Sequence, residues 1–339
     1  MIEKNLIKRS FFVIAILVLL EWKKSLKYKP ESYPYQEMSE TEVWNEYEKN
    51  PDFRVIDQNF TILKTPSMED HKITLLIKSA PGNIDKRART RKQLEPYKNQ
   101  FNFFFVIGTF EDPKLVEAIN SEYAQGKDIL QISIKDGYRH LIYKVLAAFQ
   151  WLYENRSPKL EWMVSMDDDL HFDVEEFLNS SLTWDQNPNS LICNRVYRNF
   201  PPIRDPKESL SSKWSIPVNE WPIDRYPDFC LGWIYAVKPT LGLQFALASR
   251  STPIISIDDM YITGIIRERL RDHVKIKPMV EGWTNYWNCP AMILFRIYLL
   301  PTLAYPRELA EAWPWIQIRF FACQIIEFFT TSSYCQNLF

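Results

Sequence analysis

The sequence predicts an α/β fold built on a mostly parallel sheet that is flanked by helices. From about residue 72 onward, short apolar stretches alternate with longer ones in which apolar residues recur every three or four positions. Strands that are separated by helices of roughly 10–20 residues favour parallel pairing, with helices on both faces of the sheet. One strand-like stretch ends in three successive aspartates, at the edge of the sheet where ligands bind in such folds.

The predicted elements follow one another along residues 72–270. Strands are expected at residues 73–78, 101–107, 129–134, 162–166 and 191–194. Helices are expected between them, at about residues 84–98, 113–123 and 137–155. The third helix has the clearest apolar spacing, and its apolar residues are Leu141, Val145, Leu146, Phe149 and Leu152. Further along, the strand-like residues 254–257 lead into the helix-like residues 260–270.

The N-terminal segment predicts a membrane anchor. Basic residues precede an unbroken apolar stretch over residues 11–20, and a helix over residues 6–22 would be about 25 Å long, which suits a thin membrane. No small-residue cleavage site follows, so an uncleaved signal anchor fits better than a removed signal peptide, with a buried core helix as the alternative. We therefore expect a cytoplasmic tail and anchor at residues 1–22, a polar stem at 23–68 and a lumenal catalytic domain at 69–339.

Composition narrows the class of protein. A formal net charge of −1 provides no basic surface of the kind that nucleic-acid binding needs. The five cysteines lie without a C-x-x-C pair or a histidine at zinc spacing, so no zinc site is predicted. In a lumenal compartment one or two disulfides are expected, although the sequence does not indicate which cysteines pair. Sequons for N-glycosylation begin at Asn59, Asn155 and Asn179.

The three successive aspartates are Asp167, Asp168 and Asp169, directly after the apolar end of a predicted strand. Adjacent carboxylates repel one another, and packing alone does not favour them at a strand end. A hard divalent cation does, because Mg²⁺ and Mn²⁺ prefer oxygen ligands and are often held by one or two carboxylates and the phosphates of a substrate. The alternative interpretation is a solvated acidic turn or a helix cap, since aspartate is favoured in both.

Six short motifs lie in order between residues 72 and 270. They are SAP at 79–81 with the basic segment 86–91, FVIG at 105–108, DIL…DGYRHLIYK at 128–144, DDD at 167–169, YPDFCLG at 226–232 and DDMYITG at 258–264. Together they resemble the β1,3-galactosyltransferase and β1,3-N-acetylglucosaminyltransferase family of Golgi enzymes. The sequence departs from the family pattern at Leu94, His140, Trp233 and Asp258, which marks a divergent member.

This resemblance implies a GT-A-like, Rossmann-like fold, a UDP-sugar donor, and an inverting transfer that forms a β1,3 linkage to a glycan acceptor. It also implies a divalent metal cofactor, Mn²⁺ or Mg²⁺, and a single-pass type II protein of the Golgi membrane with a lumenal catalytic domain. A homodimer is left open. Many GT-A enzymes have a later metal-binding histidine, and His273 is the nearest candidate in this sequence. Beyond residue 275, aromatic-rich stretches predict packed helices that complete the acceptor side.

The resemblance assigns the donor side of the site. Asp169 and Asp167 are the expected metal ligands, while Asp167 or Asp168 contacts the ribose or the waters of the metal. Arg87 and Arg91 lie one helical turn apart, where they can reach the uridine or diphosphate, with a solvated basic helix as the alternative. Lys144, the last residue of the third motif, joins this donor-binding set.

The acceptor side is assigned to Asp258 and Asp259. An inverting displacement needs a base to take the proton of the acceptor hydroxyl, and Asp259 stands at the motif position that the family uses for it. Both aspartates also precede a predicted helix, so capping is the alternative, and for Asp258 the favoured one. Two other classes of function remain open: a metal-dependent phosphohydrolase, and a catalytically inactive glycan-binding or chaperone-like lumenal protein of the same fold.

Overall fold

The computed structural model describes residues 60–171, 173–204, 212–270 and 274–279, together with the short strands at 54–55 and 305–306. The predicted anchor, most of the stem, the sequon at Asn59, His273 and the predicted helices beyond residue 280 lie outside the described residues. Within the described part of the chain, no helix is both long enough and apolar enough to cross a membrane.

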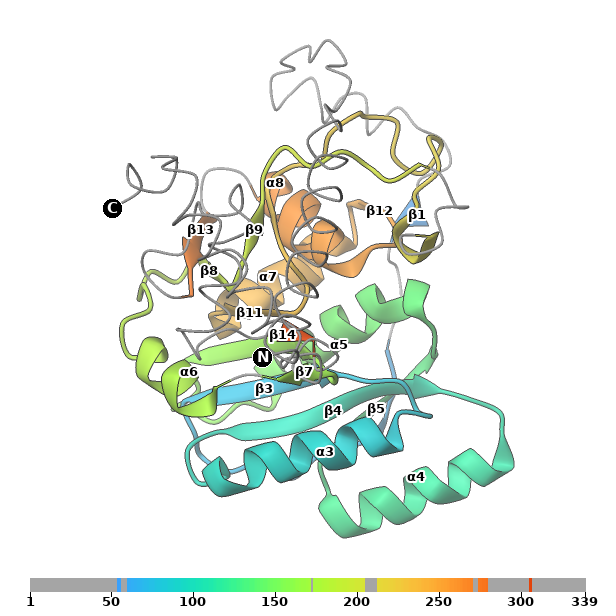
Figure 1. The fold of residues 1–339 in the computed structure, drawn as a ribbon, viewed down its shortest axis with the longest axis vertical. Helices are drawn as coiled ribbons and strands as arrows, with labels where there is room; N and C mark the ends of the chain where they lie inside the picture. Colours follow the sequence, from blue (N-terminus) through green and yellow to red (C-terminus); the bar gives the residue numbers. More distant parts are fainter. Residues whose placement is uncertain are drawn as a thin grey trace, which may run out of the picture.

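An eight-stranded sheet forms the centre of the molecule, in the order β13-β8-β11-β6-β3-β4-β5-β2 (Figure 1). Its strands are β2 (Ile62–Lys64), β3 (Ile73–Lys78), β4 (Asn102–Thr109), β5 (Ile129–Lys135), β6 (Trp162–Asp167), β8 (Ser190–Cys193), β11 (Ile234–Val237) and β13 (Lys275–Pro278). The four central strands, β6-β3-β4-β5, pair in parallel as predicted. However, β11 runs antiparallel to both of its neighbours, and β2 runs antiparallel to β5.

The sheet is therefore mixed, but it is mostly parallel as predicted. Six of its eight strands run in one direction, since β13 is parallel to β8 and only β11 and β2 are reversed. Parallel neighbours need a long crossover connection, which α3, α4 and α5 provide for the central strands. The return of the chain from β8 to β11 carries no such crossover helix among the described residues, and β11 inserts between β6 and β8 in the opposite direction. Three two-stranded sheets pair β1 (Arg54–Val55) with β12 (Pro253–Ile254), β9 (Val196–Tyr197) with β10 (Phe229–Cys230), and β7 (Leu170–His171) with β14 (Tyr305–Pro306).

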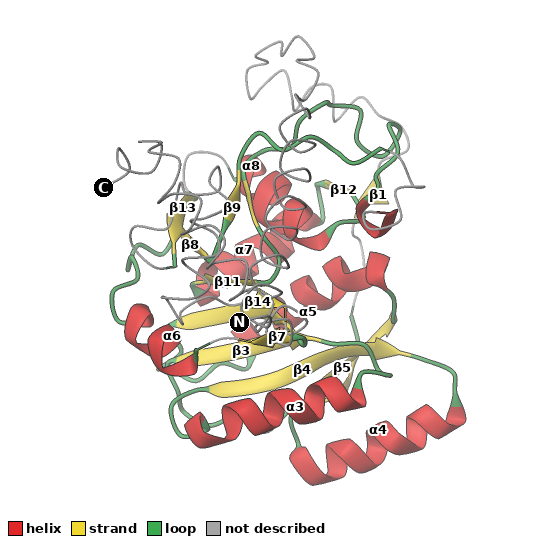
Figure 2. Cartoon of the chain, viewed as in Figure 1, coloured by secondary structure: helices red, strands yellow, loops and turns green. Residues whose placement is uncertain are grey.

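The helices cover both faces of the sheet (Figure 2). They are α3 (Ile84–Leu94), η1 (Glu95–Tyr97), α4 (Pro113–Gly126), η2 (Tyr138–His140), α5 (Leu141–Glu154), α6 (Val174–Ser181), η3 (Ser212–Trp214), α7 (Pro239–Ser249), the π-helix η4 (Met260–Ile266) and α8 (Arg267–Arg269). Successive residues of β3 face opposite ways, because Leu75 and Ile77 pack with α3 and α6 whereas Leu76 packs with α5 and α7. Ile119 of α4 packs on the α3 side, against Ile107 and Ile129.

Local sequence pattern located these elements closely. The strand β3 and the start of α3 lie where they were predicted, and the predicted helix at 137–155 is a short 3₁₀ turn followed by α5. The strand predicted at 254–257 is shorter, since β12 ends at Ile254. The helix predicted at 260–270 begins as a π-helix, a form that is common near functional sites. The carboxyl ends of β3, β4, β5 and β6 meet at one edge of the sheet, and the candidate site lies there.

Candidate active site

Lys78, the last residue of β3, links the two predicted acidic clusters. Its side chain is buried, and its ammonium lies 2.9 Å from Asp167 Oδ1 and 3.1 Å from Asp258 Oδ2. It also donates to the carbonyl oxygen of Gly232 at 2.9 Å. An ammonium has three N–H donors, so these three acceptors fill its capacity. Lys78 was predicted only as a strand end, although a lysine that closes a buried apolar strand needs an anionic partner.

The three successive aspartates diverge from one another at the end of β6. Asp168 is buried and accepts hydrogen bonds from Ser79 Oγ at 2.6 Å and Asn83 Nδ2 at 2.9 Å. Asp169 is about one-third exposed, and its Oδ2 lies 2.9 Å from Lys86 Nζ. Asp167 is equally exposed and pairs with Lys78. Burial raises the pKa of Asp167 to about 6, against the positive charge of Lys78, which lowers it.

Arg87 is fully buried and holds the loop after β3 in place. Its guanidinium pairs with Glu122 of α4 through two hydrogen bonds of 2.8 Å. Its remaining donors bind Ser79 Oγ and the carbonyl oxygens of Ala80 and Pro81. All five N–H groups of Arg87 therefore have protein partners. The alternative of a solvated basic helix is wrong for Arg87, and as the side chain lies here it has no donor left for a nucleotide.

Arg91 lies one turn further along α3 and joins the same group of charges. It is partly exposed, lies 2.7 Å from Glu122, and forms two hydrogen bonds with Asp128, at 2.7 and 2.9 Å. Its guanidinium also stands 4.7 Å from the centre of the Phe105 ring. The predicted contact of Arg91 with the donor remains a prediction, while its place in this ion-pair cluster is clear.

Lys144 of α5 ties the ends of three strands together. It is buried and donates to Asp136 Oδ2 at 2.8 Å and to the carbonyl oxygen of Ser79 at 2.7 Å. The same carboxylate oxygen of Asp136 accepts from the amide N–H of Gly108 at 2.6 Å. Burial lowers the pKa of Lys144, and the negative charge of Asp136 opposes that shift. Lys144 therefore holds the backbone of Ser79, whose hydroxyl group donates to Asp168.

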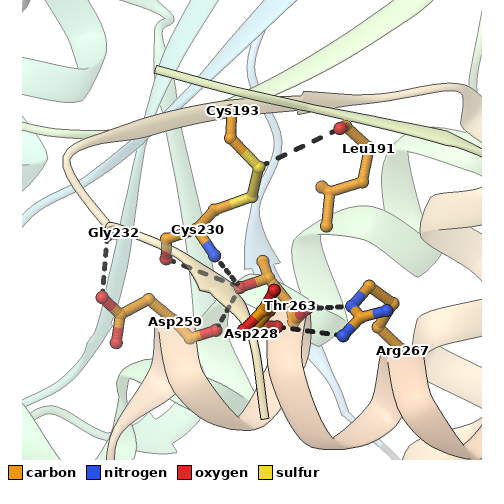
Figure 3. Close-up of a disulfide and its surroundings, with 8 residues drawn as sticks. All are labelled: Leu191, Cys193, Asp228, Cys230, Gly232, Asp259, Thr263 and Arg267. Atoms are coloured by element: carbon orange, nitrogen blue, oxygen red, sulfur yellow. Dashed lines mark hydrogen bonds between the residues drawn. A yellow bond between two sulfur atoms is a disulfide. The ribbon is translucent and has the colours of Figure 1, made fainter. Parts of the chain in front are cut away.

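Asp259 is held by backbone amides rather than by a cation. Its Oδ2 accepts from the N–H of Gly232 at 2.7 Å (Figure 3). Its Oδ1 accepts from the N–H of Met260 at 2.8 Å. Burial and the neighbouring negative charge of Asp258 together raise the pKa of Asp259 to about 7, against the positive charge of Lys78, which lowers it. Asp259 thus makes the capping contact that the sequence offered as an alternative, with its second oxygen on Gly232.

For Asp258 the favoured expectation of a helix cap is wrong. The structure places Asp259 at the start of η4, and Asp258 lies buried against Lys78 instead. The reason is electrostatic: the ammonium of Lys78 at the end of β3 offers a buried carboxylate a stronger partner than a free helix N–H does. Sequence pattern along one segment cannot reveal a partner that comes from another strand.

A disulfide lies beside Asp258 and Asp259, which we call the acid pair. The two cysteines that form it were not predictable from the sequence. Cys193 at the end of β8 is joined to Cys230 of β10. Thr263 of η4 accepts from the amide of Cys230 at 2.9 Å and donates to the carbonyl oxygen of Asp259 at 2.5 Å, so it connects the two (Figure 3). The disulfide, β10 and the start of η4 therefore form one connected unit around Asp259.

The carboxylates at the open edge fit a divalent cation in part. Asp167 and Asp169 are each about one-third exposed, and oxygen ligands of this kind suit Mg²⁺ or Mn²⁺ when substrate phosphates complete the shell. Within the described residues, no three side chains among His, Cys, Asp and Glu already converge on one metal position. The site therefore offers carboxylates for a shared metal and diphosphate, rather than a complete metal cage.

Comparison with known proteins identifies the family. The family model described as Galactosyltransferase matches residues 85–278. The chain belongs to the galactosyltransferase family. This family member is 26% identical over 269 residues to the human protein named Beta-1,3-galactosyltransferase 5, covering 76% of this chain and 83% of the relative. It is also 26% identical to a Xenopus laevis Lactosylceramide 1,3-N-acetyl-beta-D-glucosaminyltransferase B, covering 65% of this chain and 61% of that one.

Among solved structures, a mannosyltransferase from Pyrobaculum calidifontis in complex with GDP-Man and Mn²⁺ has a TM-score of 0.32 to this galactosyltransferase-family chain at 12% identity. It covers 79% of this chain and 74% of its own. The family match itself spans every site residue described above except those between Lys78 and Asn83, which precede it. The mixed sheet with helices on both faces agrees with the GT-A-like fold that the sequence predicts. Membership of the family supports glycosyltransferase activity.

Proposed function

We propose that this chain is an inverting glycosyltransferase that transfers a hexose, galactose or N-acetylglucosamine, from a UDP-sugar to a hydroxyl group of a glycan acceptor and forms a β1,3 linkage. One observation carries the proposal. Lys78 joins Asp167, at the exposed edge of the sheet, to Gly232, whose amide holds Asp259. A donor-binding acidic cluster and a candidate base therefore belong to one rigid arrangement.

On the donor side, Asp169 and Asp167 are the residues that would hold Mn²⁺ or Mg²⁺. When bound, such a cation neutralises the diphosphate and stabilises UDP as a leaving group. Asp168 supports donor binding indirectly. Its hydrogen bonds with Ser79 and Asn83 fix the backbone between Asp167 and Asp169. Lys86, which is partly exposed next to Asp169, offsets part of the negative charge of the three aspartates in the absence of donor.

Arg87, Arg91 and Lys144 support the same side from behind. The five hydrogen bonds of Arg87 shape the Ser79–Pro81 loop, so we assign Arg87 an indirect role in donor binding. Arg91 is partly exposed and retains the direct role, toward uridine or diphosphate. Lys144 holds the carbonyl oxygen of Ser79 and thereby the end of β3.

On the acceptor side, Asp259 takes the proton of the attacking hydroxyl. The acceptor oxygen forms a bond to the anomeric carbon from the face opposite the diphosphate, while the bond between that carbon and the diphosphate oxygen breaks. The electron pair leaves with UDP, and the anomeric configuration inverts. Because burial raises the pKa of Asp259 to about 7, its carboxylate is a stronger base than an ordinary aspartate and is still ionised at neutral pH in about half of the molecules.

The expected cellular setting is the lumenal side of the Golgi membrane, with residues 1–22 as the anchor. A disulfide between Cys193 and Cys230 suits an oxidising compartment. Asn155 and Asn179 are exposed and open to glycosylation there. Expression in membranes followed by endoglycosidase digestion should shift the mobility of the protein. An unchanged mobility, together with protease digestion of the C-terminal region in intact microsomes, would contradict this topology.

The enzymatic proposal is tested by UDP release. The full chain is incubated with Mn²⁺, a panel of UDP-sugars, and glycan acceptors that end in galactose or N-acetylglucosamine. We expect acceptor-dependent UDP release with one donor, and a β1,3 linkage by NMR of the product. UDP binding without release from any donor would favour the inactive, glycan-binding alternative. Metal-dependent release of inorganic phosphate from nucleotides would favour the phosphohydrolase.

A further inference from the structure

We propose that Tyr138 and Trp214, with Lys213 between them, form a platform on which a neutral pyranose of the acceptor stacks beside Asp259. This inference rests on the proposed function, because it specifies where the acceptor of that reaction lies. It assigns an acceptor-binding role to three residues that the sequence motifs left without one.

The first observation is exposure. Among the described residues, Tyr138 and Trp214 are the two aromatic side chains that are more than a third exposed, each at 39%. Most other aromatic side chains of the described sheet and helices pack into the core clusters. Exposed aromatic rings give up apolar burial, and two of them near one point of the surface indicate a binding surface.

The second observation is that the two rings flank one lysine. The ammonium of Lys213 lies 4.5 Å from the ring centre of Trp214 and 5.8 Å from the ring centre of Tyr138. Tyr138 belongs to η2, before α5, whereas Trp214 ends η3, more than seventy residues later. Two segments that are distant in the sequence therefore bring their aromatic residues to one place.

Arg139 explains how these segments meet the acid pair. Its guanidinium donates to the carbonyl oxygen of Ser215, next to Trp214, at 2.9 Å, and to Ser256 Oγ. Ser256 precedes Asp258 by two residues, and its amide and hydroxyl are both held by Glu220. One arginine, adjacent to Tyr138, thus anchors the segment of Trp214 and the segment of the acid pair together.

Electrostatics place Tyr138 close to the acid pair as well. Desolvation raises the pKa of Tyr138, and the negative charges of Asp258 and Asp259 contribute to the same shift. The hydroxyl therefore stays protonated and can donate a hydrogen bond to a sugar oxygen.

The chemistry of this surface matches a sugar ring. Tyrosine and tryptophan offer large, rigid, amphipathic faces, and the face of a pyranose that carries axial C–H groups is its most apolar part. Lys213 offers three N–H donors for the hydroxyl groups at the rim of the ring. A pyranose on this platform would present one hydroxyl toward Asp259, which is the arrangement that proton abstraction requires.

The test uses the full-length protein and methyl glycosides, because an aromatic aglycone would itself stack on the rings. The probes are methyl β-galactoside, methyl β-N-acetylglucosaminide and methyl β-lactoside. For Trp214→Ala and Tyr138→Ala we expect the acceptor KM to rise about tenfold, which corresponds to about 1.4 kcal/mol and lies within the range of aromatic stacking contacts. The donor KM and the slow release of UDP to water should change less than about twofold. Tyr138→Phe keeps the ring and should recover most of the affinity.

Leu182→Ala is the control, because Leu182 is 81% exposed and lies after α6, away from η2 and η3. Equal acceptor KM values for Trp214→Ala and the wild type would overturn the platform. Saturation-transfer NMR of the same glycosides, with and without UDP, gives a second readout that needs no turnover. Loss of the signal in Trp214→Ala supports the proposal, and no signal from any probe on the wild type contradicts it. UDP affinity is measured separately, so that a failure of the proposed function appears there and not in the glycoside signal.

Discussion

The two acidic clusters at this edge of the sheet differ in what balances their negative charge. In the donor cluster, Asp167 pairs with Lys78 and Asp169 with Lys86, each at 2.9 Å. In the acceptor cluster, Asp258 pairs with the same Lys78, whereas the nearest described partners of the Asp259 carboxylate are the amides of Gly232 and Met260.

This difference indicates which cluster is suited to binding a metal and diphosphate and which to accepting a proton. Carboxylates that already hold cationic partners at an open edge can exchange them for a divalent cation and a diphosphate. A carboxylate whose pKa is raised by burial and by a neighbouring carboxylate, as that of Asp259 is, can accept a proton. Lys78 serves both clusters, but the described partners of Asp169 and Asp259 are different. A substitution at either of these two residues should therefore leave the other cluster intact, and the following predictions use that separation.

The largest effect is expected for Asp169→Ala. Removing this carboxylate should abolish detectable transfer and weaken metal and UDP binding together, because the metal bridges carboxylate and diphosphate. The fold should remain, since Asp169 is partly exposed and pairs with Lys86 at the surface. UDP affinity is measured by calorimetry with Mn²⁺ and with EDTA, and thermal unfolding serves as the control. A UDP affinity that EDTA does not change would contradict the proposal that Asp169 holds a metal ion that binds the diphosphate.

The next effect is expected for Asp259→Asn. We expect kcat to fall by about 10²–10⁴-fold, the usual contribution of a general base, while UDP and metal binding stay near normal. Steady-state kinetics and calorimetry on the same preparation separate the two effects. Asp258→Asn is the comparison variant, and because it removes one partner of Lys78 it should alter stability as well. A rate for Asp259→Asn above about a tenth of the wild-type value would return Asp259 to the role of a cap.

A smaller loss is expected for Gly232→Ala. A Cβ at this position would lie 3.0 Å from both Cβ and Oδ2 of Asp259, so the carboxylate must shift. A displacement of about 1 Å at a reacting group can cost about 10²-fold in rate, and we expect a fall of up to that size in kcat with unchanged UDP affinity. Gly82→Ala is the matched control, because a Cβ there meets nothing within 4 Å. Equal rates for the two variants would show that the position of Asp259 is not critical.

The smallest effect is a pH dependence. Because the pKa of Asp259 is about 7, kcat/KM for the acceptor should fall about tenfold for each pH unit below that value and level off above it. UDP affinity is measured at each pH, since Asp167 titrates at about 6. A flat profile between about pH 5 and 8 would leave the acceptor cluster without its distinguishing property.

Stability should follow the same group with a definite sign. At pH values between the ordinary pKa of aspartate and about 7, the native state keeps a proton on Asp259 that the unfolded state has lost. The free energy of unfolding therefore decreases as the pH rises through this interval. Asp259→Asn removes this part of the slope, and urea unfolding at several pH values measures it. A slope that is unchanged by the substitution would contradict the raised pKa.

The central part of the fold was predictable because its signals are local. Alternation of strand and helix patterns located β3, β4, β5 and β6, and the aspartates after β6 marked the edge that carries the site. The direction of β11 was not predictable, because antiparallel insertion between β6 and β8 depends on pairing across long stretches of chain. The same holds for the partners of Cys193 and Cys230.

The site was predictable as a set of acidic residues, but not as an arrangement. Arg87 and Arg91 were expected to share a helix face, and they do meet at Glu122 of α4. That Arg87 is fully buried could not be inferred, because neighbouring basic residues of the same segment are exposed. The role of Lys78 was not predictable, because its partners come from three separate segments that only the folded chain brings together.

The insertion of β11 between β6 and β8 has a consequence for biosynthesis. As the chain emerges from the ribosome, β3, β4, β5 and β6 can pair with one another, but β6 keeps a free edge until residue 237 has been made. That edge consists of buried apolar residues such as Met163, Val164 and Met166, and an open apolar strand edge recruits other chains. The nascent protein therefore exposes this apolar edge while residues 168–237 are being synthesised, and binding of a chaperone during this interval would protect it from aggregation.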